Sequence, residues 1–201
     1  MKRIITITVI AICTICQIKA IDFRDDHGIT ASAFFGCSHY QIKIPYTGGY
    51  WKNDFYHPVI TPRLGYRFNS AWEAGLLYRY ERQTYENEHY SGIGAYGEWS
   101  FLRFLRGFRL IAEAHILHCV FKGNKENGWY GKNNMTEVGM MPCIAYNIPG
   151  SPVDIKLRYL FLGFNNSHSR YKGRAPGCLG RGDWIIDASL RRLEIGASIT
   201  F

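Results

Sequence analysis

After Ala20, the 201-residue chain has no long hydrophobic run. A membrane-spanning helix needs about 20 consecutive apolar residues, so this absence argues against a helical membrane anchor in that part of the chain. Repeats, linkers and low-complexity segments are missing as well. Residues 21–201 are therefore expected to form one domain.

The chain also lacks a strong excess of either charge. Residues 1–20 contain three basic residues and no acidic one, so without them the net charge falls from +8 to about +5. An excess that small and that scattered does not indicate a nucleic-acid partner. It can still favour anionic lipid head groups.

No metal or cofactor site is predicted. The four cysteines after residue 20 (Cys37, Cys119, Cys143 and Cys178) match no zinc spacing. His115 and His118 are three residues apart, which places them on opposite faces of a strand. The strands predicted below put Cys119 and Cys178 toward the same rim, so this pair could form a disulfide in an exported protein. Small buried cysteines without a bridge are the other interpretation.

The first twenty residues have the pattern of a secretory signal peptide. A basic start, Met1-Lys2-Arg3, precedes an almost wholly apolar stretch from Ile4 to Ile15. Cleavage is predicted after Ala20, although Ile18 and Lys19 depart from the usual small residues.

Strict alternation is the strongest pattern that the chain does contain. In its last ten residues, one face holds Leu193, Ile195, Ala197, Ile199 and Phe201, and the other holds Arg192, Glu194, Gly196, Ser198 and Thr200. A β-strand repeats every two residues. The pattern therefore predicts a strand with one apolar and one polar face, which can begin as early as Trp184.

Seven further segments alternate in the same way: 28–42, 58–68, 71–86, 89–102, 108–121, 135–147 and 153–164. The connections after the second, fourth and sixth segments are short, whereas those over 43–57, 122–134 and 165–182 are long. Membrane β-barrels have short periplasmic turns and long external loops. The predicted fold class is all-β: an eight-stranded antiparallel up-and-down transmembrane β-barrel over 21–201, after a signal peptide over 1–20.

In its closing strand, with Gly196, Ile199 and Phe201, the chain resembles the small eight-stranded outer-membrane barrels of the OmpA/OmpX type, also described as the "outer membrane protein beta-barrel domain". The resemblance implies a place in the cell outer membrane of a Gram-negative envelope. It also implies that Phe201 is the signal read by the barrel-assembly machinery. It implies no single activity.

The polar faces of the segments would fill the lumen if the apolar faces meet lipid. They carry seven basic and seven acidic residues: Arg63, Arg67, Glu73, Arg79, Glu81, Glu98, Arg109, Glu113, Glu137, Asp154, Lys156, Arg158, Arg192 and Glu194. Buried charges are tolerated when they are paired. We therefore expect an ion-pair network that plugs the barrel. A soluble barrel would alternate too, but with its charges facing water.

Three functions are compatible with such a barrel: a structural or surface-interaction protein, a narrow channel, and a lipid-A-modifying enzyme. The first is favoured, and no catalytic activity is expected. The enzyme alternative has one local candidate, Ser167-His168-Ser169, but neighbouring strand residues point to opposite faces and the known deacylase motif does not match.

The predicted external loops suggest lipid or surface partners. They are rich in lysine and arginine, which can bind the phosphates of lipopolysaccharide. Arg181-Gly182-Asp183 is an adhesion tripeptide, although three residues match easily by chance. The expected partners are thus outer-membrane lipids, lipopolysaccharide and a possible surface ligand.

Overall fold

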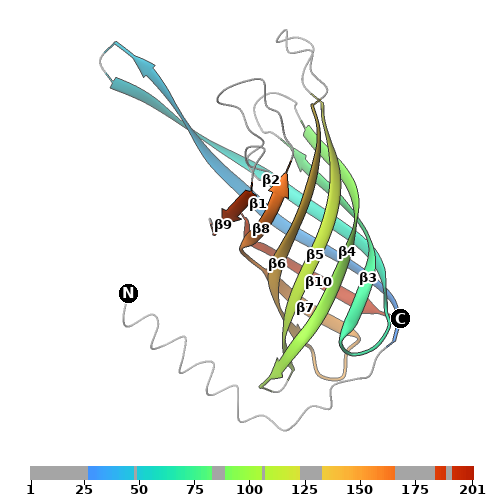
Figure 1. Cartoon of the computed structure of the whole chain (residues 1–201). Helices are drawn as coiled ribbons and strands as arrows, with labels where there is room; N and C mark the ends of the chain where they lie inside the picture. Colours follow the sequence, from blue (N-terminus) through green and yellow to red (C-terminus); the bar gives the residue numbers. More distant parts are fainter. Residues whose placement is uncertain are drawn as a thin grey trace, which may run out of the picture.

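The chain forms one antiparallel sheet that closes into a barrel, as a computed structural model shows (Figure 1). The structure describes residues 27–47, 49–82, 89–105, 107–122, 133–165, 184–188 and 192–201. Its strands are β1 (Gly28–Tyr46), β2 (Gly49–Arg67), β3 (Trp72–Arg82), β4 (His89–Phe104), β5 (Phe108–Lys122), β6 (Asn133–Asn147), β7 (Val153–Arg158), β8 (Phe161–Asn165), β9 (Trp184–Asp187) and β10 (Glu194–Thr200). No helix in these ranges has the length and apolar character needed to cross a bilayer.

The ten strands occupy the eight strand positions of a closed barrel wall, which are called staves below. Strands β1 to β6 pair in chain order, β6 pairs with β7, β7 with β10, and β10 returns to β1. Since β7 and β8 both pair with β6, they are two parts of the seventh stave, and β9 and β10 are two parts of the eighth. The predicted closed, eight-stranded antiparallel barrel is confirmed.

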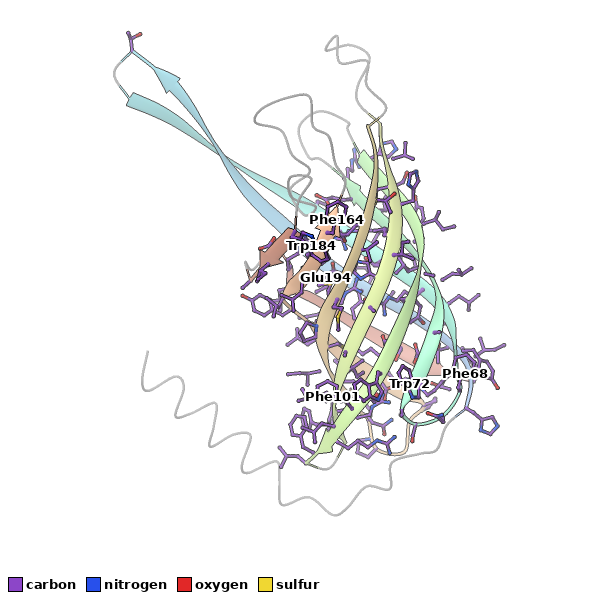
Figure 2. The ribbon with its side chains drawn as sticks, viewed as in Figure 1. Phe68, Trp72, Phe101, Phe164, Trp184 and Glu194 are labelled. Carbon is purple, nitrogen blue, oxygen red and sulfur yellow. The ribbon has the colours of Figure 1, made fainter. Side chains whose placement is uncertain are left out.

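The two faces of the wall have opposite character. On β3, Trp72, Leu76 and Tyr78 are exposed on the outside, whereas Glu73 and Arg79 are buried inside. Figure 2 shows Phe68, Trp72 and Phe101 at one end of the barrel and Phe164 and Trp184 toward the other. The molecule thus exposes its large apolar side chains and buries its charged ones, the reverse of a water-soluble barrel.

The segment 43–57 was predicted to be a loop, and this prediction is wrong. Strands β1 and β2 stay paired without a break from Gly28 opposite Arg67 to Tyr46 opposite Gly49. Figure 1 shows the resulting hairpin reaching far beyond the barrel. The stretch is rich in aromatic residues, which favour strands, and the glycines after Tyr46 suit a tight turn.

The seventh stave contains one extra residue, Leu160. Arg158 lies opposite Cys143 in β6, but Leu162 lies opposite Met140, so the register changes by one residue between them. Leu160 has φ 71°, in the left-handed region that is found in bulges of the G1 type. The uninterrupted strand 153–164 predicted from the sequence is therefore wrong. Alternation along 153–164 predicts Phe161 on the apolar face of Ile155, Leu157 and Tyr159, but it is fully buried inside the barrel.

The eighth stave is also interrupted. It begins at Trp184, the earliest start predicted, but Asp187 pairs with β8 while Glu194 pairs with β7. The β1–β10 ladder ends at Gly36 opposite Glu194, and the β2–β3 ladder ends at Val59 opposite Glu81. Past these rungs the β1–β2 hairpin is paired only with itself among the described residues.

Three short connections, at residues 68–71, 105–107 and 148–152, lie at the same end of the barrel. The Asn69 side chain accepts hydrogen bonds from the backbone N–H groups of Ala71 and Trp72, at 2.8 and 3.0 Å, and so closes the first of them. Such Asx turns need few residues. The short links predicted from the sequence are thus tight turns.

Candidate functional site

The barrel interior is the candidate site, because it gathers the charged residues of every stave. All fourteen charged side chains expected to face the lumen are buried there: Arg63, Arg67, Glu73, Arg79, Glu81, Glu98, Arg109, Glu113, Glu137, Asp154, Lys156, Arg158, Arg192 and Glu194. Asp187 is buried with them. They pair across the lumen in three layers, described here from the end with the short turns.

The first layer is centred on Asp154 of β7. Its Oδ2 atom receives Arg67 Nη2 at 3.0 Å and Arg109 Nη2 at 2.5 Å, and Asn147 donates to Oδ1 at 2.9 Å. Arg67 also pairs with Glu73 at 3.0 Å. Four staves are joined through this one carboxylate.

The second layer is centred on Glu98 and Glu113. Lys156 Nζ lies 2.6 Å from Glu98 Oε2, and Arg63 Nη1 lies 2.9 Å from Glu98 Oε1. Arg63 and Arg158 both pair with Glu113, the latter at 2.8 Å. Each of the two glutamates therefore binds two cations from other staves.

Phe34 of β1 packs against two of these cations. The guanidinium carbon atoms of Arg63 and Arg158 stand 4.6 and 4.2 Å from the centre of its ring. Tyr96 covers Arg63 at 4.2 Å and donates its hydroxyl to Glu73 at 2.9 Å. Guanidinium groups bind aromatic faces favourably in desolvated surroundings, so the aromatic rings hold the network as well as fill space.

The third layer lies toward the long connections. Arg79 and Arg158 share Glu194 at 3.0 and 2.5 Å, and His115 Nε2 lies 3.1 Å from Glu137 Oε1. Arg192 contacts three groups: Asp187 at 3.2 Å, Glu137 at 3.7 Å and the ring of Phe161, 4.3 Å from its centre. Residues of the interrupted eighth stave therefore form the end of the network.

The network offsets a large desolvation penalty. An isolated buried charge costs several kcal/mol, and pairing offsets this only when most bonding positions are used. Seven basic and eight acidic side chains are buried among the described residues. Because both signs are nearly equal and interleaved, the interior neither attracts nor repels ions of one sign strongly, and its chemistry is that of a packed polar core.

Three residues that contact the charged network were not predicted to lie in the interior: Phe34, Phe161 and Asp187. Alternation assigns Phe161 to the opposite face, and it does not indicate Phe34 or Asp187 at all. Both phenylalanines pack against glycines: a Cβ atom on Gly196 would lie 2.6 Å from the Phe34 ring, and one on Gly163 would lie 2.6 Å from the Phe161 ring. Inward glycines opposite a large aromatic residue are the signal that could have indicated Phe34.

The cysteines and histidines form no catalytic or metal arrangement in the described ranges. Cys119 and Cys143 are buried in the interior without a disulfide, and Cys37 is exposed. His118 faces outward and contacts Thr136 at 3.0 Å, while His115 faces the interior. Within these ranges no group of three potential ligands is placed to hold a metal ion.

Several sequence predictions lie outside the described residues. These are the signal peptide with its cleavage at Ala20, Cys178, Ser167-His168-Ser169 and Arg181-Gly182-Asp183. Phe201 is described: its backbone N–H donates to the Ile29 carbonyl at 2.9 Å, and its side chain is exposed. Its role as an assembly signal stays a prediction.

Comparison with known proteins gives a likeness in structure but none in sequence. No family model matches the chain, and no curated protein matches its sequence. Among solved structures, the chain is similar to the crystal structure of Neisserial surface protein A, with 12% identity and a TM-score of 0.47, over 86% of this chain and 96% of that one. The assignment of a closed barrel to this chain is therefore based on its own strand pairing and burial.

Proposed function

We propose that the chain is an integral outer-membrane protein with a structural or surface-interaction role, whose interior is plugged by the ion-pair network. The main support for this proposal is the reversed distribution of polarity, because the charged side chains lie inside the barrel and the large apolar side chains lie outside. In lipid, only a closed barrel satisfies all strand hydrogen bonds, and an apolar outer face is then the stable one. No catalytic role is proposed.

The height of the apolar band supports this location. On β3 the outward residues from Trp72 to Tyr80 are apolar or aromatic, and Arg82 is the first outward charge. The nine residues from Trp72 to Tyr80, at about 3.3 Å each and tilted by about 40°, span about 23 Å along the barrel axis. This is close to the height of about 25 Å of the apolar band of outer-membrane barrels.

The stacked rings at one end of the band are consistent with a membrane interface. Trp72 and Trp99 stack with ring centres 5.8 Å apart, and Phe101 follows at 5.7 Å from Trp99. Aromatic side chains of this kind gather at the interface of bilayer and water. With the short turns on the periplasmic side, the long connections face outward, toward lipopolysaccharide and possible surface ligands.

A plug is favoured over a channel by the packing of the interior. Eight staves leave room for little more than side chains, and three layers of paired charges cross the lumen. A narrow conducting path is the second candidate, since the buried hydroxyls of Ser32, Thr61 and Ser198 have no hydrogen-bond partner among the described residues and share the β10–β1–β2 side of the wall. Water could wet that side.

Two measurements test the proposal. Outer-membrane fractions run on SDS gels should give a faster band before boiling than after, because a closed barrel resists SDS. In planar bilayers, the purified protein should show no steady single-channel current. An unshifted band from the soluble fraction contradicts the membrane role, and a steady current favours the channel.

A further inference from the structure

The outer face carries an apolar groove that the interior network does not explain. It has a volume of about 680 Å³ and crosses β4, β5, β6, β8 and β9. Its outward side chains are Ala95, Ala114, Ile116, Val138, Met140, Leu162, Phe164 and Trp184. Figure 2 shows Phe164 and Trp184 at the end of the barrel away from Phe68, Trp72 and Phe101.

The groove exists because small residues lie between large ones. Ala95 and Gly97 of β4 and Ala114 of β5 form its floor, with Ala114 directly opposite Gly97 and Met140 in the ladders. Larger side chains of β5, β6 and β8 border it. On the rest of β3 and β4 the outward face carries Leu76, Tyr78 and Trp99 instead, which stand out from the wall.

We propose that this groove binds an acyl chain of the lipid A anchor of lipopolysaccharide, an inference that rests on the proposed outer-membrane location. A methylene group takes up about as much space as a liquid water molecule, roughly 30 Å³, so the groove has room for about twenty of them. One to two acyl chains fit. Their dispersion contacts with the lining, small individually, add up along the chain.

Polar side chains lie just beyond one end of the groove, an arrangement that suits an amphiphile. His118 follows Ile116 on the same face of β5, and Thr136 precedes Val138 on the same face of β6. The two are joined by a 3.0 Å hydrogen bond between His118 Nδ1 and Thr136 Oγ1. Beside them Phe164 and Trp184 lie with ring centres 5.9 Å apart. An apolar groove that ends in polar and aromatic side chains matches a lipid with its head group at the membrane surface.

The composition of the connections between the groove strands favours an anionic lipid of the external leaflet. The polar end lies toward the long connections, which are external in the proposed orientation. Residues 122–132 and 166–183, which join the groove strands, contain seven basic and two acidic residues. The phosphates of lipid A match this excess, so we commit to lipopolysaccharide over a phospholipid.

A filled groove provides the test. The full chain is purified from outer membranes in mild detergent, and bound lipopolysaccharide is measured by native mass spectrometry. Ala114→Phe fills the floor, whereas Ala197→Phe adds the same side chain at an exposed outward position on β10, a strand that does not line the groove. Wild type and Ala197→Phe should retain lipopolysaccharide, and Ala114→Phe should retain about fivefold less or lower, a loss of roughly 1 kcal/mol in binding.

A second measurement covers the case in which Ala114→Phe does not fold. A photoreactive residue at Val138 should crosslink to lipopolysaccharide in the native membrane, and one at Leu64 of β2, an exposed outward position on a strand that does not line the groove, should do so much less. Equal retention by all proteins, equal crosslinking at both positions, or phospholipid as the bound species would overturn the inference. The heat shift on gels separates the two proposals. If the protein shows the shift but lipopolysaccharide does not bind in the groove, only the groove proposal is wrong. If the wild-type protein shows no shift, both proposals are wrong.

Discussion

At the residue scale, the interior is held by cations that each have more than one partner. Phe34 illustrates why apolar residues belong in this network, because its ring lies against the guanidinium groups of both Arg63 and Arg158. Phe34 is fully buried, so these cations depend on the ring and on their glutamates instead of water. Single substitutions here should therefore affect several bonds at once.

Phe34→Ala should lower the free energy of unfolding by about 3–5 kcal/mol, because it leaves a cavity and uncovers two buried cations. Urea titration in lipid vesicles measures this. Phe35→Ala is the matched control: Phe35 is the next residue, points outward and is 59% exposed, so lipid fills the space it leaves. If the two substitutions cost the same, the interior role of Phe34 is wrong.

Lys156→Met should cost about 3 kcal/mol, since Glu98 would lose its 2.6 Å partner while remaining buried. Adding Glu98→Gln should recover part of that loss. The double-mutant cycle measures the coupling between the two groups. Additive effects would contradict a direct buried pair, whereas recovery is expected from the contact between them.

Much of this site follows from alternation alone. Charged residues that sit between apolar neighbours face the opposite side of a strand, which is why residues such as Arg63 and Glu113 could be assigned to the interior from the sequence. Their partners could not be assigned, because Arg63 lies 50 residues from Glu113 in the chain and their contact depends on the register of several staves. Alternation also says nothing about aromatic residues on the polar face, such as Phe34.

At the element scale, the interruptions of the seventh and eighth staves determine the contacts in the third layer of the network. The bulge at Leu160 turns Phe161 inward, and the chain between Asp187 and Glu194 brings Arg192 onto that ring. A bulge usually has glycine or asparagine at a left-handed position, and here leucine occupies it. The sequence therefore contained no signal that the inward and outward faces exchange at Leu160. The aromatic stretch of the β1–β2 hairpin likewise did not indicate whether residues 43–57 form strands or a loop.

Deletion of Leu160 should leave the folded, heat-modifiable band in place. Without the extra residue, Phe161 would follow Tyr159 directly, so plain alternation would keep Phe161 and Gly163 inside and Leu162 and Phe164 outside. Deletion of Leu160 and Phe161 together is the contrast: it shifts the rest of β8 by one residue, turns Leu162 and Phe164 inward, and should abolish the band. Loss of the band in both variants, or in neither, would show that the bulge does not simply set the phase of β8.

The β1–β2 hairpin past Gly36 and Val59 should be dispensable for the barrel. The ladders to β10 and β3 end at those residues, so removal of residues 40–55 with a two-residue turn in their place breaks no described rung of the wall. The shortened protein should keep its heat shift, and its unfolding free energy should change by less than about 1 kcal/mol. Loss of the folded band would assign the hairpin a part in the wall.

At the scale of the whole molecule, the reversed polarity makes the effect of a surface charge depend on the solvent around it. Leu76 lies in the middle of the apolar band on β3 and is 61% exposed, and Tyr80 lies near its outer edge, close to Arg82. In water, an arginine at either exposed position would change stability by less than about 0.5 kcal/mol. In a bilayer, Leu76→Arg should cost about 2–4 kcal/mol and Tyr80→Arg about 0–1 kcal/mol, because the penalty falls toward the interface. Unfolding titrations in vesicles compare the two directly, with Leu76→Ala as the control for lost apolar area. A graded cost that follows depth is the result expected of a barrel surrounded by lipid, and equal, negligible costs would mean that water surrounds this face.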